Sequence, residues 1–220
     1  MKIRLHHCHQ TRSMRVLWLL NEMGVDFELA VYPFDGSLRE PDFLAMSPAG
    51  RVPALEIDGQ SMFESGAMLE YLCDLFPETG MGRAAGSEER AEWLVWLHFA
   101  ETIGQHVANL NQQILFIYPP EARSPVVVKL EGKRAEKCLA ALEDKLADGR
   151  DHLLRSGFSA ADIAVGQSVY MLRHFVRTSD FPHVEVWYHR ITARPAFQKS
   201  LPQDGDPVLW AQQFYSLEAE

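Results

Sequence analysis

Two adjacent residues that suit opposite charges, Glu64 and Ser65, stand where an apolar strand pattern changes to a helical one. A serine can cap the N-terminus of a helix, and the unpaired N–H groups and positive dipole end there attract a carboxylate. A glutamate beside them suits an ammonium group. The pair therefore fits the head of an α-amino acid, and a plain helix cap is the alternative interpretation of the same residues.

The loop from Cys8 to Ser13 offers hydroxyl, thiol, imidazole and guanidinium groups between a predicted strand and a predicted helix. Such a loop lies at the carboxyl edge of the sheet, the usual ligand position in α/β folds. Thr11 or Ser13 could cap the helix, or a hydroxyl could donate to a bound thiolate and lower the thiol pKa. Cys8 could be a nucleophile, although a lone cysteine more often packs as a small apolar residue.

A third segment, from Gly50 to Leu55, places Pro53 at the beginning of a strand. Proline has no N–H for the strand ladder, so it belongs at a sheet edge, at a strand start or in a cis turn. A cis bond between Val52 and Pro53 would turn the N–H and C=O of Val52 outward, toward a peptide-like ligand. An ordinary trans proline at an edge is the alternative.

The elements that must position these residues lie within residues 1–77. Alternating apolar residues predict strands, Gly24 suits the end of a helix, and Asp58-Gly59 is a strong hairpin signal. The predicted elements are a strand at 3–5, a helix at 14–23, a strand at 27–32, a short helix at 41–46, a hairpin of 52–57 and 61–63, and a helix from 65 to 76. This order predicts a small α/β domain with a mixed four-stranded sheet.

Residues 78–86 are rich in glycine and predict a linker, and no strand pattern follows it. The helical patterns after the linker cover Trp96 to Ile114, 126–146 with Leu130 among its apolar positions, and a run that follows the capping box of Ser159 and Asp162. Residues 87–220 therefore predict an all-helical second domain.

Composition excludes several classes of protein. The 220 residues carry 30 acidic and 21 basic side chains, a net charge of −9, without the clustered basic face that nucleic acid needs. No apolar run approaches the length of a membrane span, and the first residues lack a signal-peptide core, so a cytoplasmic protein is expected. Three cysteines without metal-ligand spacing predict neither a metal site nor structural disulfides.

Five segments resemble the glutathione S-transferase family, in its order and over nearly the whole chain. They are Ser13-Met-Arg-Val-Leu-Trp-Leu-Leu20, Ser47-Pro-Ala-Gly-Arg-Val-Pro-Ala-Leu55, Phe63-Glu-Ser-Gly-Ala-Met-Leu-Glu-Tyr-Leu72, Phe158-Ser-Ala-Ala-Asp-Ile163 and Trp187-Tyr-His-Arg-Ile-Thr-Ala-Arg-Pro-Ala-Phe197. The resemblance is to the bacterial cytosolic type. It implies a thioredoxin-like N-terminal domain, an all-helical C-terminal domain, a homodimer and glutathione as co-substrate, without a metal.

The resemblance also implies a glutathione site. Pro53 matches a cis proline, and Val52 matches the residue that pairs with the cysteinyl backbone of glutathione. Glu64 and Ser65 match the pair that holds the γ-glutamyl head. Arg51 stands where a basic residue often reaches the glycyl carboxylate, with a solvated surface charge as the alternative.

The catalytic position of the family falls closest to Thr11, with Gln10 and Ser13 as neighbours. The loop contains no tyrosine, which excludes the tyrosine mechanism of the mammalian members. Threonine keeps the O–H group, but its methyl group limits the rotamers available to the donor. Relatives with threonine here look more like glutathione-dependent disulfide reductases.

The electrophile site of the family is formed partly by the first long helix of the second domain. Its polar candidates are Gln105, His106 and Asn109, although a surface histidine is the favoured interpretation of His106. The sequence thus predicts a transferase that joins glutathione to small electrophiles, as in detoxification. The alternatives are a glutathione-dependent disulfide or peroxide reductase and a non-catalytic module that binds glutathione or another ligand.

Overall fold

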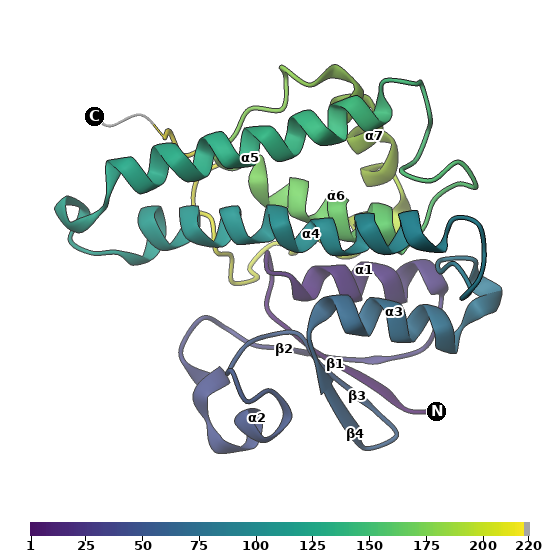
Figure 1. Cartoon of the computed structure of the whole chain (residues 1–220). Helices are drawn as coiled ribbons and strands as arrows, with labels where there is room; N and C mark the ends of the chain where they lie inside the picture. Colours follow the sequence, from purple (N-terminus) through teal and green to yellow (C-terminus); the bar gives the residue numbers. More distant parts are fainter. Residues whose placement is uncertain (218–220) are drawn as a thin grey trace. The chain divides into compact units, whose positions relative to one another are not determined.

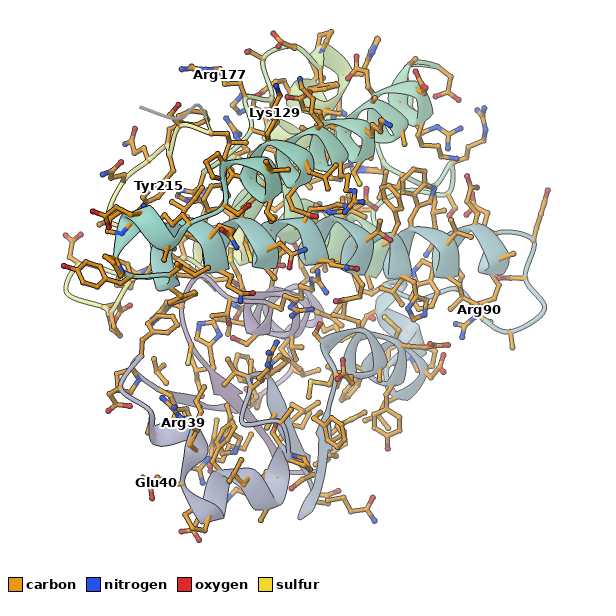
Figure 2. The ribbon with its side chains drawn as sticks, turned by 60° about the vertical axis from the view of Figure 1, so that its left-hand side comes forward. Arg39, Glu40, Arg90, Lys129, Arg177 and Tyr215 are labelled. Atoms are coloured by element: carbon orange, nitrogen blue, oxygen red, sulfur yellow. The ribbon has the colours of Figure 1, made fainter. Side chains whose placement is uncertain are left out.

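The computed structural model describes residues 1–217, which form two compact units. The first unit comprises Met1–Trp93 and Thr192–Leu209, and the second comprises Leu94–Ile191 and the described residues from 210 to 217. The first unit is thus larger than the predicted first domain, since it also contains residues 78–93 and 192–209. Two ion pairs link these added segments to the predicted first domain: Arg90 (Figure 2) pairs with Glu70, and Arg194 Nε lies 2.7 Å from Glu22 Oε1.

The first unit contains a four-stranded mixed sheet in the order β2-β1-β3-β4, as the sequence predicts. The strands are β1 (Ile3–His7), β2 (Glu28–Val31), β3 (Ala54–Ile57) and β4 (Gln60–Phe63). The β1–β2 pair is parallel, and the other two pairs are antiparallel. Asp58 and Gly59 join β3 to β4 with φ angles of 48° and 84°, the left-handed backbone that a tight hairpin requires.

The helices of the first unit cover both faces of the sheet (Figure 1). They are α1 (Ser13–Met23), α2 (Pro41–Met46), α3 (Ser65–Leu75) and α8 (Pro195–Gln198), with the 3₁₀ turns η1 (Ser37–Arg39) and η2 (Pro77–Thr79). Leu5 faces the side of α1 and α3, and the next residue, His6, faces the ring of Phe43 in α2. The alternation in β1 therefore lets one short strand bury both of its faces.

All elements described in the second unit are helical. They are α4 (Arg90–Asn111, which begins in the first unit), the π-helical turn η3 (Gln112–Phe116), the 3₁₀ turn η4 (Pro120–Ala122), α5 (Pro125–Leu146), α6 (Ala160–Leu172) and α7 (Pro182–Thr192). The predicted capping box is confirmed, because Ser159 and Asp162 each bond the backbone N–H groups of the α6 N-terminus. Among residues 1–217, no helix is both long and apolar enough to cross a membrane.

The apolar positions of α5 differ in burial: Leu130 is 45% exposed, whereas Ala135, Leu139, Leu142 and Leu146 are buried. The buried side of the helix begins instead at Glu131 and Gly132. A Cβ atom on Gly132 would lie 2.5 Å from Leu217 Cδ1, so the C-terminal segment packs directly on this part of α5. The neighbour that covers this end of the helix therefore comes from far along the chain.

Candidate functional site

A hollow of about 120 Å³ in the first unit brings together all five residues predicted to bind glutathione. Its lining consists of Arg51, Val52, Pro53, Glu64 and Ser65 with Arg12, Ser47, Ala49 and Phe63. The antiparallel register pairs Ala54 with Phe63, so the residues before β3 and after β4 meet at one edge of the sheet. The hairpin thus joins two segments that the sequence shows separately.

The segment before β3 is held in shape by two features. The Val52–Pro53 peptide bond is cis, as the resemblance implied. The hydroxyl of Ser47 donates to the carbonyl oxygen of Arg51 at 2.7 Å. This bond ties the strand entry to the end of α2 and fixes the backbone that lines the hollow.

Glu64 has an uncommon backbone conformation for a residue other than glycine, with φ 76° and ψ 107°. Such conformations cost on the order of 1–3 kcal/mol and concentrate at functional sites. The side chain is exposed. Within the described chain, it makes no hydrogen bond or ion pair with another residue. The strained backbone therefore belongs to a residue that lines the hollow with a carboxylate.

The prediction of Ser65 as the N-cap is wrong, because Ser65 is the first helical residue of α3 and Glu64 holds the cap position. The Ser65 hydroxyl accepts a hydrogen bond from Nη1 of the fully buried Arg15 at 3.1 Å. A hydroxyl that accepts can still donate its own hydrogen. Arg15 therefore fixes the orientation of the Ser65 hydroxyl at the N-terminus of α3, a contact that no local pattern indicated.

The hollow carries two guanidinium groups, Arg12 and Arg51, and one carboxylate, Glu64. Arg51 is exposed, and no other described residue bonds its guanidinium. Arg12 was not selected from the sequence, although it lies next to Thr11 in the loop that was. Its position directly before the predicted helix was the one feature of the sequence that could have indicated it.

None of the three catalytic candidates lines this hollow. Gln10 is buried, and its side-chain oxygen accepts the N–H of Leu209 at 2.7 Å. Ser13 is fully buried, with Oγ 2.7 Å from Nδ1 of His7. Thr11 is half-buried, with Oγ1 2.9 Å from the carbonyl oxygen of Cys8. Thr11 is therefore the most accessible of the three.

The protein's own thiols are poorly suited to nucleophilic chemistry. Cys8, Cys73 and Cys138 are all buried and make no disulfide with one another. Burial raises the pKa of Cys8 to about 11 and that of Cys73 to about 12. At neutral pH, both therefore remain thiols.

The electrophile candidates on α4 have two different environments. Gln105 is exposed, whereas His106 Nδ1 lies 2.7 Å from Oε2 of Glu131 in α5. Burial alone would raise the pKa of Glu131, but hydrogen bonds from His106, Asn109 and Arg134 hold it below its usual range. His106 is therefore not the surface histidine that the sequence favoured. It is held with Asn109 by a buried carboxylate.

A larger hollow of about 850 Å³ lies in the second unit, between α5 and the segment from Phe175 to Phe181. Its rim includes Lys129 and Arg177 (Figure 2). None of the residues selected from the sequence lines it. The smaller hollow is the one in which the predicted residues gather.

Family comparisons agree with this assignment. The family model described as the glutathione S-transferase N-terminal domain matches residues 11–75, and the one described as the C-terminal domain matches residues 109–195. Glutathione S-transferase 3 of Zea mays is 31% identical over 202 residues, with 86% of this chain and 87% of that protein covered. Glutathione S-transferase GstB of Escherichia coli K12 is 29% identical, with 87% of this chain and 93% of that protein covered.

A solved relative supports the same conclusion. A sphingomonad glutathione S-transferase in complex with glutathione is 29% identical, with a TM-score of 0.76 and coverage of 90% of this chain and 96% of that one. The fold is that of the resemblance, a thioredoxin-like N-terminal domain and a helical C-terminal domain. The chain belongs to the glutathione S-transferase family.

Proposed function

We propose that the hollow of the first unit binds glutathione and that the protein transfers the glutathione sulfur to small electrophilic carbon centres. The main support for this proposal is the match between the charges of the hollow and those of glutathione. Glutathione at neutral pH has two carboxylates and one ammonium group, and the hollow presents two guanidinium groups and one carboxylate. The net charge of the chain opposes an anionic ligand, so a few placed groups must supply the attraction.

Each part of glutathione has a partner in this arrangement. Glu64 holds the ammonium group, and the Ser65 hydroxyl with the N-terminus of α3 holds the adjacent carboxylate. Val52 pairs its backbone with the cysteinyl residue, and Arg51 neutralises the glycyl carboxylate. Arg12 adds a second positive charge beside the catalytic loop.

The Thr11 hydroxyl stabilises the thiolate by donating a hydrogen bond to it. Each unit by which the thiol pKa falls corresponds to about 1.4 kcal/mol of preference for the thiolate. Since the cysteines of the chain are buried thiols, they do not compete as nucleophiles. Gln105, His106 and Asn109 remain the candidates for contacts with the electrophile. The same proposal includes a homodimer, which the family resemblance supports, and a location in the cytoplasm, which the free thiols support.

Two measurements test the function. Calorimetric titration should detect binding of glutathione, and a variant with Arg51→Ala should bind it several-fold more weakly. Parallel assays with an aryl halide and with a small mixed disulfide then separate attack on carbon from attack on sulfur. Turnover of the disulfide alone would replace the transferase by a reductase, and binding without either turnover would support a non-catalytic module.

A further inference from the structure

A continuous series of polar contacts extends from the catalytic loop to Asp206, near the end of the first unit. Thr11 Oγ1 lies 2.8 Å from Ser13 Oγ, which lies 2.7 Å from His7 Nδ1. His7 Nε2 lies 3.4 Å from His9 Nδ1, and His9 Nε2 lies 3.2 Å from Asp206 Oδ2. The proposed contacts with glutathione use only the first of these residues.

The series is buried in its middle and open at both ends. His7 and Ser13 are fully buried, and the His9 side chain is 7% exposed. Thr11 is half-buried, and the side chain of Asp206 is 34% exposed. Two buried imidazoles that bond each other are unusual, because a buried polar ring needs partners for both nitrogens. Here, the series supplies every partner.

The order of the hydrogens follows from the carboxylate end. An ionised carboxylate can only accept, and Asp206 Oδ2 also accepts the N–H of Gln203 at 2.7 Å. His9 must therefore donate from Nε2, which leaves its Nδ1 as an acceptor when the ring is neutral. His7 then donates from Nε2 to that atom and accepts at Nδ1 the hydrogen of Ser13.

Two further observations fit this order. Burial, followed by the proximity of His9, lowers the pKa of His7 to about 3, so its ring is neutral at physiological pH. The Ser13 oxygen, having given its hydrogen to His7, accepts the N–H of Cys8 at 3.2 Å and can accept the hydroxyl of Thr11. The wire requires that Thr11 give its hydrogen to Ser13 and not to the carbonyl oxygen of Cys8, which lies 2.9 Å from the same Oγ1 atom. In that order, the Thr11 oxygen can accept from a ligand.

We propose that these five residues form a proton wire that removes the thiol proton of glutathione, an inference that rests on the proposed function. Thr11 Oγ1 takes the thiol proton and gives its own hydrogen to Ser13 Oγ, which gives its hydrogen to His7 Nδ1. His7 passes its Nε2 hydrogen to His9 Nδ1, and His9 passes its Nε2 hydrogen to Asp206 Oδ2.

The transfer is balanced at every atom. The S–H bond breaks and leaves its electron pair on sulfur, and an O–H bond forms on Asp206, from which solvent can take the proton. Both histidines end neutral in their other tautomer. Thr11 ends as a hydrogen-bond donor to the thiolate. The same series of proton transfers therefore removes the thiol proton and stabilises the thiolate that it leaves. Thr11 touches the substrate, whereas Ser13, His7, His9 and Asp206 act through it.

The wire is tested kinetically with Asp206→Asn, which keeps the shape of the side chain but cannot take up a proton. Formation of the thiolate after rapid mixing with glutathione, followed by its ultraviolet absorbance, should slow by about tenfold or more. Asp204→Asn is the matched control, because Asp204 is exposed in the same segment and bonds no other residue of the described chain. Its rate should equal that of the unmodified protein, and Asp206→Glu should recover most of the lost rate.

A second measurement uses the ligand-free protein. Nitrogen-15 NMR of the histidine rings should show that His7 and His9 are both protonated at Nε2. A proton on Nδ1 of either ring would overturn the wire, because the order of donors would be broken. This result does not depend on the folding of any variant.

Binding of S-methylglutathione, which has no thiol proton, separates the wire from the function on which it rests. Unchanged affinity in Asp206→Asn together with slow thiolate formation supports the wire. Unchanged affinity with an unchanged rate overturns the wire and leaves the glutathione site intact. Failure of the unmodified protein to bind S-methylglutathione would overturn both proposals.

Discussion

Each unit of the molecule buries a polar cluster, and the two clusters differ in how they end. In the second unit, Asp162 is fully buried and accepts from the N–H groups of Leu153 and Ser159 and the indole of Trp187, at 2.9–3.0 Å. The acceptor and the three residues that donate to it are all shielded from solvent. The cluster is closed on itself.

The cluster of the first unit, His7, His9 and Ser13, is open at both ends. One end leads to the half-buried Thr11, and the other leads to Asp206. The hydrogen bonds of the closed cluster stabilise the N-terminus of α6 and do nothing else. An open one can change the order of its hydrogens without losing a bond. We therefore expect the closed cluster to affect stability alone and the open one to affect activity as well.

The largest expected effect is on stability, from Asp162→Ala. Three buried donors lose their acceptor at once, and we expect the free energy of unfolding to fall by about 3–5 kcal/mol. Urea unfolding followed by circular dichroism measures this loss. Asp144→Ala is the control, since Asp144 is an exposed aspartate of the same unit. A loss as small as that of the control would remove the distinction between the two clusters.

The second effect is a dependence of stability on pH that arises from His7. Its pKa is about 3 in the folded protein and 6.5 in the unfolded chain, so the unfolded chain binds the additional proton between these values. The contribution of a neutral His7 is therefore fully present above pH 6.5 and is lost as pH falls toward 3, at about 1.4 kcal/mol per pH unit. Comparison of unfolding free energies at pH 6.5 and 4.5 measures it.

The control for the pH effect separates His7 from the other histidines. A variant with His7→Gln should lose most of the slope, whereas His98→Gln, which changes an exposed histidine, should keep it. Equal slopes in the unmodified protein and His7→Gln would show that burial of this ring does not govern the acid response of the first unit.

The third effect concerns activity and comes from Thr11→Ala. Loss of a hydrogen bond to a charged sulfur corresponds to about 2 kcal/mol, or ~30-fold in kcat, with a smaller change in the KM for glutathione. Thr11→Ser keeps the O–H group and should stay within a few-fold of the unmodified protein. Steady-state kinetics with an aryl halide provide both constants. Unchanged turnover in Thr11→Ala would move the role to Ser13, Gln10 or a backbone amide.

The sequence predicted those features whose signals are local. Gly24 ends α1 in the left-handed conformation, Pro41 begins α2, and Asp58-Gly59 closes the hairpin, each because a short stretch of backbone requires that residue type. The glutathione-binding candidates were also found locally. They gather in one hollow because a two-residue turn brings their two segments together.

The features that the sequence did not predict depend on residues far apart in the chain. The contact of His9 with Asp206 spans almost the whole length of the chain, and Arg15 reaches Ser65 from another helix. Neither pair forms a pattern with a helix or strand period. The burial of Gly132 in α5 has the same cause, since the C-terminal segment that packs against it leaves no signal in the helix itself.

The smallest expected effect concerns the hollow of the first unit that the proposed glutathione site occupies, and it comes from Glu64→Gln. Glu64 is exposed, so its attraction for the ammonium group of glutathione is screened and corresponds to about 1 kcal/mol, or ~5-fold in Kd. The amide keeps the strained backbone and removes only the charge, so the free energy of unfolding should not change. Glu40→Gln, at an exposed glutamate outside the hollow (Figure 2), is the control in the calorimetric titration. Equal affinities in the two variants would mean that the strained position of Glu64 serves the fold rather than the ligand.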